Sequence, residues 1–124
     1  MAFNLRSIFS FFKDPEEQIR SQQYLEEQNK ILDQLVKILI SLRKEVSLCS
    51  VLADLDFLEK QIKVVNASVE VAYKAVDYIV KAYEKEMSAQ TKTFAQSIQK
   101  DRHVFVSIFH SLESEISSKK RVLS

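Results

Sequence analysis

The sequence contains no glycine, a single proline and a single cysteine among its 124 residues. Tight turns between strands need residues that accept positive φ, most often glycine, and phosphate-binding loops need glycine so that the backbone can approach the ligand closely. The absence of glycine therefore argues against a β-rich fold, a dinucleotide-binding fold and a P-loop enzyme. Because 46% of the residues are hydrophobic and 28% are charged, the chain should fold rather than stay disordered. We predict an all-α protein.

The sequence also lacks long apolar runs and features of secreted proteins. The single cysteine, Cys49, can form neither an intramolecular disulfide nor a cysteine-rich metal site, which is typical of a reducing compartment. No stretch approaches the roughly 20 apolar residues of a membrane-spanning helix. Arg6, Ser7 and Ser10 interrupt the first apolar run, and no small-residue cleavage site follows it. We expect an intracellular, cytoplasmic protein, with peripheral association at a membrane surface as an alternative.

The residues that are present repeat with the period of packed helices. A helix is predicted to begin at Pro15, because Asp14 is a good N-cap residue and the acids that follow favour the positive end of the helix dipole. From there the apolar residues recur at alternating intervals of three and four. They form three series: Leu25, Leu32, Leu35, Leu39, Leu42, Val46 and Cys49; Leu55, Leu58, Ile62, Val65, Val69, Ala72, Val76, Ile79 and Tyr83; and Phe94, Ile98, Phe105, Ile108, Leu112 and Ile116.

These series predict the architecture of a single domain, residues 14–124. Three helices of matched length with short connections pack as an antiparallel bundle, and the heptad rhythm makes this bundle coiled-coil-like. The turns are expected within 48–54 and 87–93. The predicted helices span about 15–47, 55–87 and 91–118. The alternative is that the second and third segments form one helix of ~65 residues, paired with a partner chain.

The N-terminal segment, residues 1–13, is predicted to form a separate amphipathic helix. At 100° per residue its apolar side chains gather on one face, and Arg6, Ser10 and Lys13 lie on the other. Such a face can pack on the bundle or on a symmetry mate, dock on a partner, rest on a membrane surface or act in targeting. The candidate partner- or membrane-binding residues are Leu5, Ile8, Phe9, Phe11 and Phe12.

The C-terminal third is mildly basic, since residues 89–124 contain three acidic and six basic residues. Lys119, Lys120 and Arg121 are weak candidates for phosphate binding. A solvated helix end whose cations suit the negative end of the dipole explains them as well. We do not expect nucleic acid to be the partner, because the sequence shows no strongly basic face and no helix-turn-helix pattern.

No catalytic constellation, metal site or cofactor site is predicted. His103 and His110 are seven residues apart, which does not match the spacing of helical metal ligands, and Cys49 falls in the apolar phase of the first helix. We therefore expect a non-enzymatic helical interaction or scaffold protein without a small-molecule substrate. It would associate with itself as a homo-oligomer or bind another helical protein. The alternatives are a peripheral membrane protein that docks by its N-terminal helix and a small nucleic-acid-binding regulator.

Overall fold

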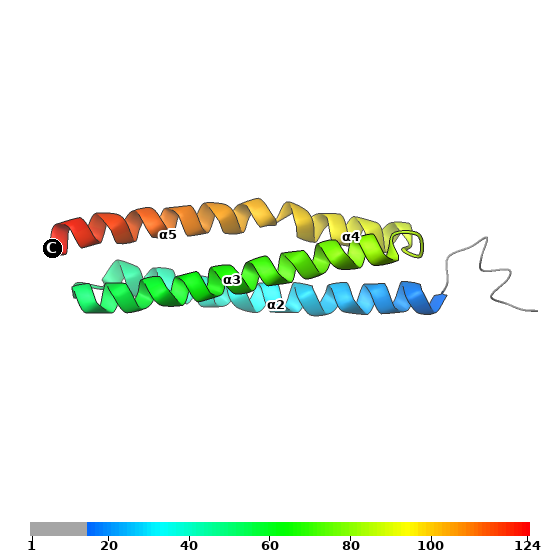
Figure 1. The fold of residues 1–124 in the computed structure, drawn as a ribbon, viewed down its shortest axis with the longest axis horizontal. Helices are drawn as coiled ribbons and strands as arrows, with labels where there is room; N and C mark the ends of the chain where they lie inside the picture. The colour runs from blue at the N-terminus through cyan, green and yellow to red at the C-terminus, as the bar shows by residue number, and fades with distance from the viewer. Residues whose placement is uncertain (1–14) are drawn as a thin grey trace, which may run out of the picture.

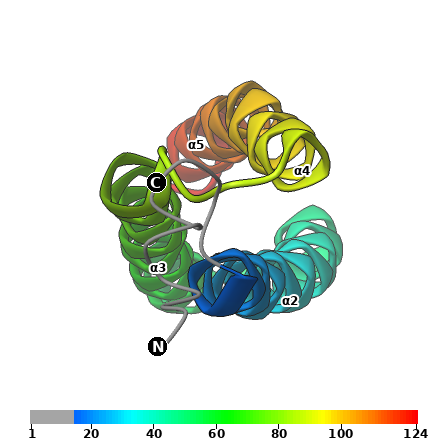
Figure 2. The same ribbon diagram turned by 90° about the vertical axis from the view of Figure 1, so that its right-hand side faces the viewer.

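A computed structural model of the chain describes residues 15–124 and confirms the all-α prediction. The helices are α2 (Pro15–Leu48), α3 (Leu52–Tyr83), α4 (Ala89–Lys100) and α5 (Arg102–Leu123). The last two follow one another with a bend, so that three long arms run up, down and up (Figures 1 and 2). The chain is thus an antiparallel three-helix bundle. The predicted N-terminal amphipathic helix, residues 1–13, lies outside the described residues.

The core is built from the three predicted apolar series. Every residue of the first two series is buried except their last members, Cys49 and Tyr83, which are partly buried against the core. In the third series Phe94 and Ile108 are also only partly buried. The core contains four further residues: Tyr73, Met87, Ala95 and Phe109. Packing of these faces is expected to supply most of the stability, because in proteins most helical stability comes from tertiary packing of an apolar face and not from helix propensity.

The first turn lies within the predicted 48–54. It comprises residues 49–51, and α3 begins at Leu52 instead of residue 55. Ser50 and Asp54 lie on either side of this position, but neither side chain caps α3. Instead Val51 occupies the N-cap position with extended backbone and without a side-chain hydrogen bond. The helix starts early because Leu55 already lies in the core, and the amide of Leu55 donates to the Val51 carbonyl at 3.1 Å.

The second turn lies earlier than the predicted 87–93, at residues 84–88. Two amides, those of Glu86 and Met87, donate to the Tyr83 carbonyl at 2.9 and 3.0 Å and close the turn without glycine. The Ser88 hydroxyl then accepts from the Thr91 amide at 3.1 Å and caps α4. The turn shows that the alternative of one helix of ~65 residues is wrong.

The third arm is not the single helix 91–118 that the periodicity predicted. It begins at Ala89, ends at Leu123 and is interrupted at Asp101. The amide of Asp101 donates to the Ile98 carbonyl at 3.1 Å, a tighter i to i−3 bond that bends the axis. The bend falls within the polar stretch 99–103 that separates Ile98 from Phe105 in the sequence.

Candidate interaction surface

Helix α3 carries a row of exposed apolar side chains in addition to its buried face. The row consists of Phe57, Val64, Val71 and Tyr78, which follow one another at seven-residue intervals. Their exposed fractions are 60%, 66%, 67% and 72%. Single exposed apolar residues are common on protein surfaces, whereas a large contiguous apolar patch usually marks an interaction site. We call these four residues the α3 outer row.

Helix α2 carries a second row of partly exposed apolar side chains. It consists of Tyr24, Ile31 and Ile38, again at seven-residue intervals and about 40% exposed. The Tyr24 ring also packs against the ring of Tyr83 on α3, with centroids 6.0 Å apart. Helices α2 and α3 are antiparallel neighbours along the bundle (Figure 1), and Ile31 of the α2 row lines the same hollow as Val64 and Val71 of the α3 outer row.

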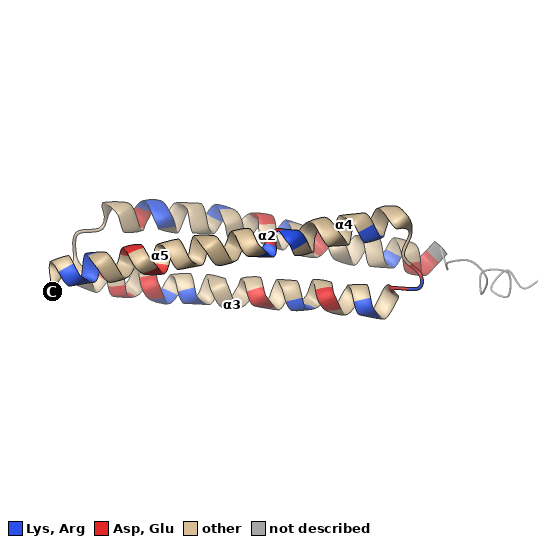
Figure 3. Cartoon of the chain, turned by 90° about the horizontal axis from the view of Figure 1, so that it is seen from above, with Lys and Arg blue, Asp and Glu red and all other residues tan. Residues whose placement is uncertain are grey.

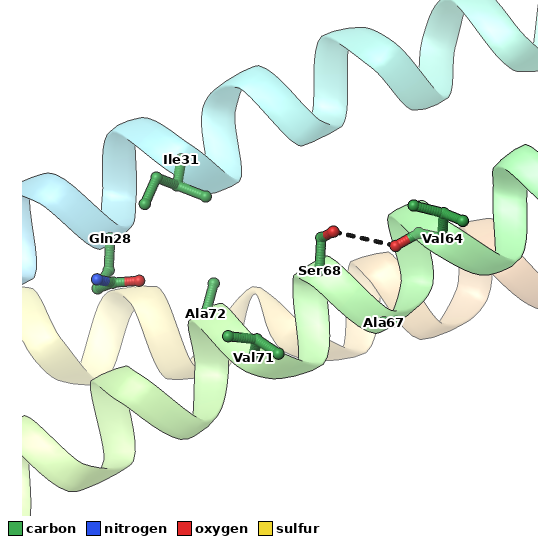
Figure 4. Close-up of a pocket in the computed structure, with 7 residues that line it drawn as sticks. All are labelled: Gln28, Ile31, Val64, Ala67, Ser68, Val71 and Ala72. Atoms are coloured by element: carbon green, nitrogen blue, oxygen red, sulfur yellow. Dashed lines mark hydrogen bonds between the residues drawn. The ribbon is translucent and has the colours of Figure 1, made fainter.

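Between the two rows lies a shallow apolar groove with a volume of about 420 Å³. Figure 4 shows Gln28 and Ile31 extending from α2 toward α3, across from Ser68 and Ala72. The floor on α3 is made of small residues, which let another backbone approach closely. The only polar group of that floor is satisfied, since the Ser68 hydroxyl donates to the Val64 carbonyl at 3.0 Å.

A second hollow of about 350 Å³ lies along the same helix pair near the first turn. It is lined by Leu48 and Cys49 from α2 and its end, by Phe57 and Leu58 from α3, and by the two acidic residues Glu45 and Asp54. The α3 outer row, from Phe57 to Tyr78, spans about 32 Å at 1.5 Å per residue. This is the length of a helix of about three heptads.

Lysines border the groove on its α3 edge. Lys60, Lys74 and Lys81 each lie three residues after a member of the α3 outer row and therefore on the adjacent strip of the helix. Within residues 15–124, no carboxylate lies within ion-pair distance of Lys74 or Lys81. Elsewhere acidic and basic residues mix along the helices (Figure 3). The groove thus has an apolar floor and one cationic edge.

The sequence by itself indicates only half of this surface. Tyr24, Ile31 and Ile38 recur at seven-residue intervals as a row that flanks the apolar series of the first helix. The α3 outer row was missed because the buried series of that helix already accounted for the apolar content expected of a bundle helix. The signal that could have found it was the seven-residue repeat of Phe57, Val64, Val71 and Tyr78 outside the core phase.

The three basic candidates at the C-terminus lie apart from this groove, and two of them bind other parts of the chain. The Lys119 ammonium donates to the carbonyls of Val46, Ser47 and Cys49, the last two at 2.7 and 3.1 Å. The Lys120 ammonium lies 2.7 Å from Asp56 and 3.1 Å from Glu59. Lys120 lowers the pKa of Asp56 through this hydrogen bond, and the two carboxylates raise the pKa of Lys120. Two of the three cationic side chains are thus already bonded to oxygen atoms of this chain, which argues against phosphate binding at this end of α5.

The remaining sequence candidates are placed as follows. Leu5, Ile8, Phe9, Phe11 and Phe12 lie outside the described residues. His103 and His110 are both exposed, and residues 15–124 contain no group of three His, Cys, Asp or Glu side chains arranged to hold a metal ion. Over the same residues, we find no helix whose apolar stretch is long enough to cross a membrane.

The fold and the surface together define an all-α three-helix bundle with an exposed apolar groove between its first two arms. Comparison of the chain with protein-family models, with curated proteins and with solved structures gave no match. The function therefore has to be argued from the surface itself.

Proposed function

We propose that this chain is a non-enzymatic helical interaction protein that binds an amphipathic helix of a partner protein in the groove between α2 and α3. The observation that carries the proposal is the pair of exposed apolar rows that flank this groove. Two antiparallel helices with small residues between them offer the groove into which the ridge of a third helix packs. The docked helix would complete a four-helix arrangement.

The magnitude of the binding energy favours a reversible contact. Full burial of a large apolar side chain stabilises by about 1.5–3 kcal/mol. The seven side chains of the two rows are about half exposed, so covering them would release roughly 5–10 kcal/mol in total. Association costs at least about 4 kcal/mol in lost freedom. A net affinity in the micromolar range or weaker is therefore expected, which suits a regulated contact and allows the free bundle to remain stable.

Charge indicates what kind of helix would bind. The lysines on the α3 edge favour a partner helix with acidic residues along one side of its apolar face. Residues 1–13 of this chain are a poorer match, because their only charged side chains are Arg6 and Lys13. A flat bilayer is also a poorer match. The strip of α2 beyond its own apolar row is polar, as Glu27 and Gln34 show, and a flat surface would have to cover it.

The N-terminal residues Leu5, Ile8, Phe9, Phe11 and Phe12 remain a second proposed contact element. Their apolar face can serve self-association or membrane docking independently of the groove. Neither alternative depends on the α3 outer row, so variants of that row separate them from the main proposal.

The test uses the full chain and two fluorescent peptides of about three heptads, identical except that one edge of the helix carries Glu in one peptide and Lys in the other. We expect the Glu peptide to bind about tenfold more tightly at low salt. Three exposed ion pairs contribute up to about 1 kcal/mol each, and the entropy lost by ordering their side chains offsets part of this gain. The remaining binding free energy corresponds to about a tenfold difference in affinity. The double variant Val64→Asp/Val71→Asp should abolish binding of both peptides.

The matched control is Val122→Asp, because Val122 is 83% exposed and lies at the end of α5. Equal affinity of the wild type and the double variant for the Glu peptide would refute the proposal. A dimeric native mass that falls to the monomer in the double variant would make a second copy the occupant. Binding to anionic vesicles that the double variant loses would make the occupant a lipid surface.

A further inference from the structure

The second turn interrupts the helical bonding of the chain at very few residues. The Met87 amide donates to the Tyr83 carbonyl at 3.0 Å. The Lys92 amide donates to the Ser88 carbonyl, also at 3.0 Å. Both are the i to i−4 bonds of an α-helix. Glu84, directly after α3, has helical angles as well, with φ −50° and ψ −45°. The helical bonds of α3 therefore continue to the Met87 amide, and those of α4 begin again at the Ser88 carbonyl.

The residue types of this turn do not require the chain to reverse. Residues 84–88 contain neither glycine nor proline, and within residues 15–124 no backbone φ is positive. The first four of these residues, Glu84 to Met87, are types that form helices readily. Ser88 is extended, with φ −69° and ψ 162°, so its φ is already close to the helical value. Helical angles at Met87 and Ser88 would therefore join α3 and α4 into one helix.

The first turn is held in a different way. Val51 is extended there, and the Lys119 ammonium of α5 donates to three carbonyls at the end of α2. Straightening of this turn would move those carbonyls away from Lys119. The cap of the second turn is local to α4, since the Ser88 hydroxyl accepts from the Thr91 amide at 3.1 Å. Of the two turns, the second is therefore the better candidate for a hinge.

The contacts that hold the third arm are made between side chains of different arms. The Arg102 guanidinium of α5 lies 2.7 Å from the Glu70 carboxylate of α3. Gln99 of α4 donates to Asp77 of α3 at 3.0 Å. Each contact needs one residue from each arm, so the same contacts form when the third arm comes from a second copy of the chain. Exchange of an identical element between two copies is a low-cost route to a dimer for this reason.

We propose that two copies of this chain exchange their third arms, so that α3 and α4 of each copy run as one helix from Leu52 to Lys100. The chain with its turn at 84–88 is the closed form, and the exchanged dimer is a second form that high protein concentration favours. Each half of the dimer keeps an α2/α3 groove, because both helices of a groove come from one copy. The dimer would thus offer two grooves to a partner with two helices. That consequence rests on the proposed function, whereas the exchange itself does not.

The experiment measures the native mass of the full chain by light scattering, over a range of concentrations and after refolding from urea at high concentration. We expect a dimer that forms as the concentration rises. Ala89→Pro should keep the chain monomeric. Proline suits the first residue of α4, and the extended Ser88 suits the position before a proline. In a continuous helix the same proline would remove a backbone bond and clash with the preceding turn.

Ser88→Ala should act in the opposite direction, because it removes the cap that favours the closed form. Loss of an N-cap corresponds to about a fivefold change per turn, and each dimer opens two turns, so the dimer should bind about thirtyfold more tightly. The matched control is Ser97→Ala. Ser97 is an exposed residue of α4 whose hydroxyl donates within the helix, to the Phe94 carbonyl at 2.7 Å. It should leave the dissociation constant of the dimer unchanged.

Two charge-reversal variants distinguish exchange from a dimer that forms at the surface. Glu70→Arg and Arg102→Glu each bring like charges together in the closed form and in their own exchanged dimer. In a mixture, exchange places the α3 of one variant against the third arm of the other, and opposite charges meet in both halves. We expect the two variants, refolded together, to give more heterodimer than both homodimers combined, as measured by native mass spectrometry.

Three results would overturn the proposal. They are a wild-type chain that stays monomeric at every concentration, a dimer that persists unchanged in Ala89→Pro, and a purely statistical mixture of the two charge-reversal variants. The double variant Val64→Asp/Val71→Asp leaves residues 84–88 intact and should still exchange. Failure of the helix-binding groove and failure of the exchange are therefore separate results.

Discussion

Lys119 is expected to stabilise the bundle by capping a helix that ends about seventy residues earlier in the chain. Helix α2 has no basic residue in its last turn, so its final carbonyls lack a local cation. The Lys119 ammonium on α5 supplies one, since it donates to the carbonyls of Val46, Ser47 and Cys49. Substitution of Lys119 by Met keeps the length of the side chain and removes all three bonds.

The size of the effect follows from these contacts. A hydrogen bond with a charged group contributes about 1.5–3 kcal/mol, and a cation at a helix C-terminus about 0.3–1 kcal/mol. Ordering a lysine side chain costs up to about 2 kcal/mol, and the three carbonyls share one ammonium. We therefore expect Lys119→Met to lower the free energy of unfolding by about 2 kcal/mol. For a chain of this length that corresponds to a fall in Tm of about 6–10 °C.

Urea unfolding followed by circular dichroism measures this difference directly, with an expected drop of about 1 M in the midpoint. Arg121→Met is the matched control, because Arg121 is exposed and its side chain forms no bond with the rest of residues 15–124. It should change the free energy of unfolding by less than about 0.5 kcal/mol. If Lys119→Met and Arg121→Met unfold at the same urea concentration as the wild type, the capping argument is wrong.

Three further predictions concern the core, an ion pair and the buried phenol. Leu39→Ala should lower the free energy of unfolding by about 2–5 kcal/mol, because Leu39 is fully buried. Ile40→Ala should change it by less than about 0.5 kcal/mol, because Ile40 is 61% exposed. Equal losses in thermal unfolding would contradict the placement of Leu39 on the buried face of the helix and of Ile40 on the exposed one. A double-mutant cycle of Asp56→Asn and Lys120→Met should show a coupling at pH 7 that begins to fall in acid below the ordinary pKa of Asp56 and in alkali above that of Lys120; a coupling that does not vary with pH would exclude the ion pair. The absorbance of tyrosinate should show one group titrating near pH 12, and Tyr73→Phe should remove it. The contribution of the neutral Tyr73 phenol to the free energy of unfolding should be lost as the pH rises from 10 to 12.

The pH limits of the Asp56–Lys120 coupling follow from the linkage between proton binding and folding. The pKa of Asp56 is lowered in the folded protein, so its contribution is present above its unfolded pKa and is lost as the pH falls through the folded one. The pKa of Lys120 is raised, so its contribution is complete below the unfolded pKa and is lost as the pH rises through the folded one. Between these limits the coupling should not vary.

The turns show where prediction from the sequence became inaccurate. The second turn was expected within 87–93 because that stretch is polar, yet Ser88 caps α4 and the helix continues through it. Glycine or proline would have fixed the position of the turn, and the chain has neither there. The bend at Asp101 was visible as a polar interruption, but whether such a stretch bends a helix or stays on its solvated face depends on the arms it packs against.

By itself the sequence determined the all-α class, the three arms and most of the core. The physical reason is that helix propensity and three-four periodicity are local properties, which can be recognised without knowing what each helix packs against. Only the tertiary structure decided which groups meet across the bundle. Lys119 reaches the end of α2, the Tyr73 ring packs against the Phe105 ring of α5, and Val64 and Val71 lie beside Ile31 to form a groove. These contacts depend on the register and rotation of neighbouring helices, which the spacing of residues along one helix does not specify.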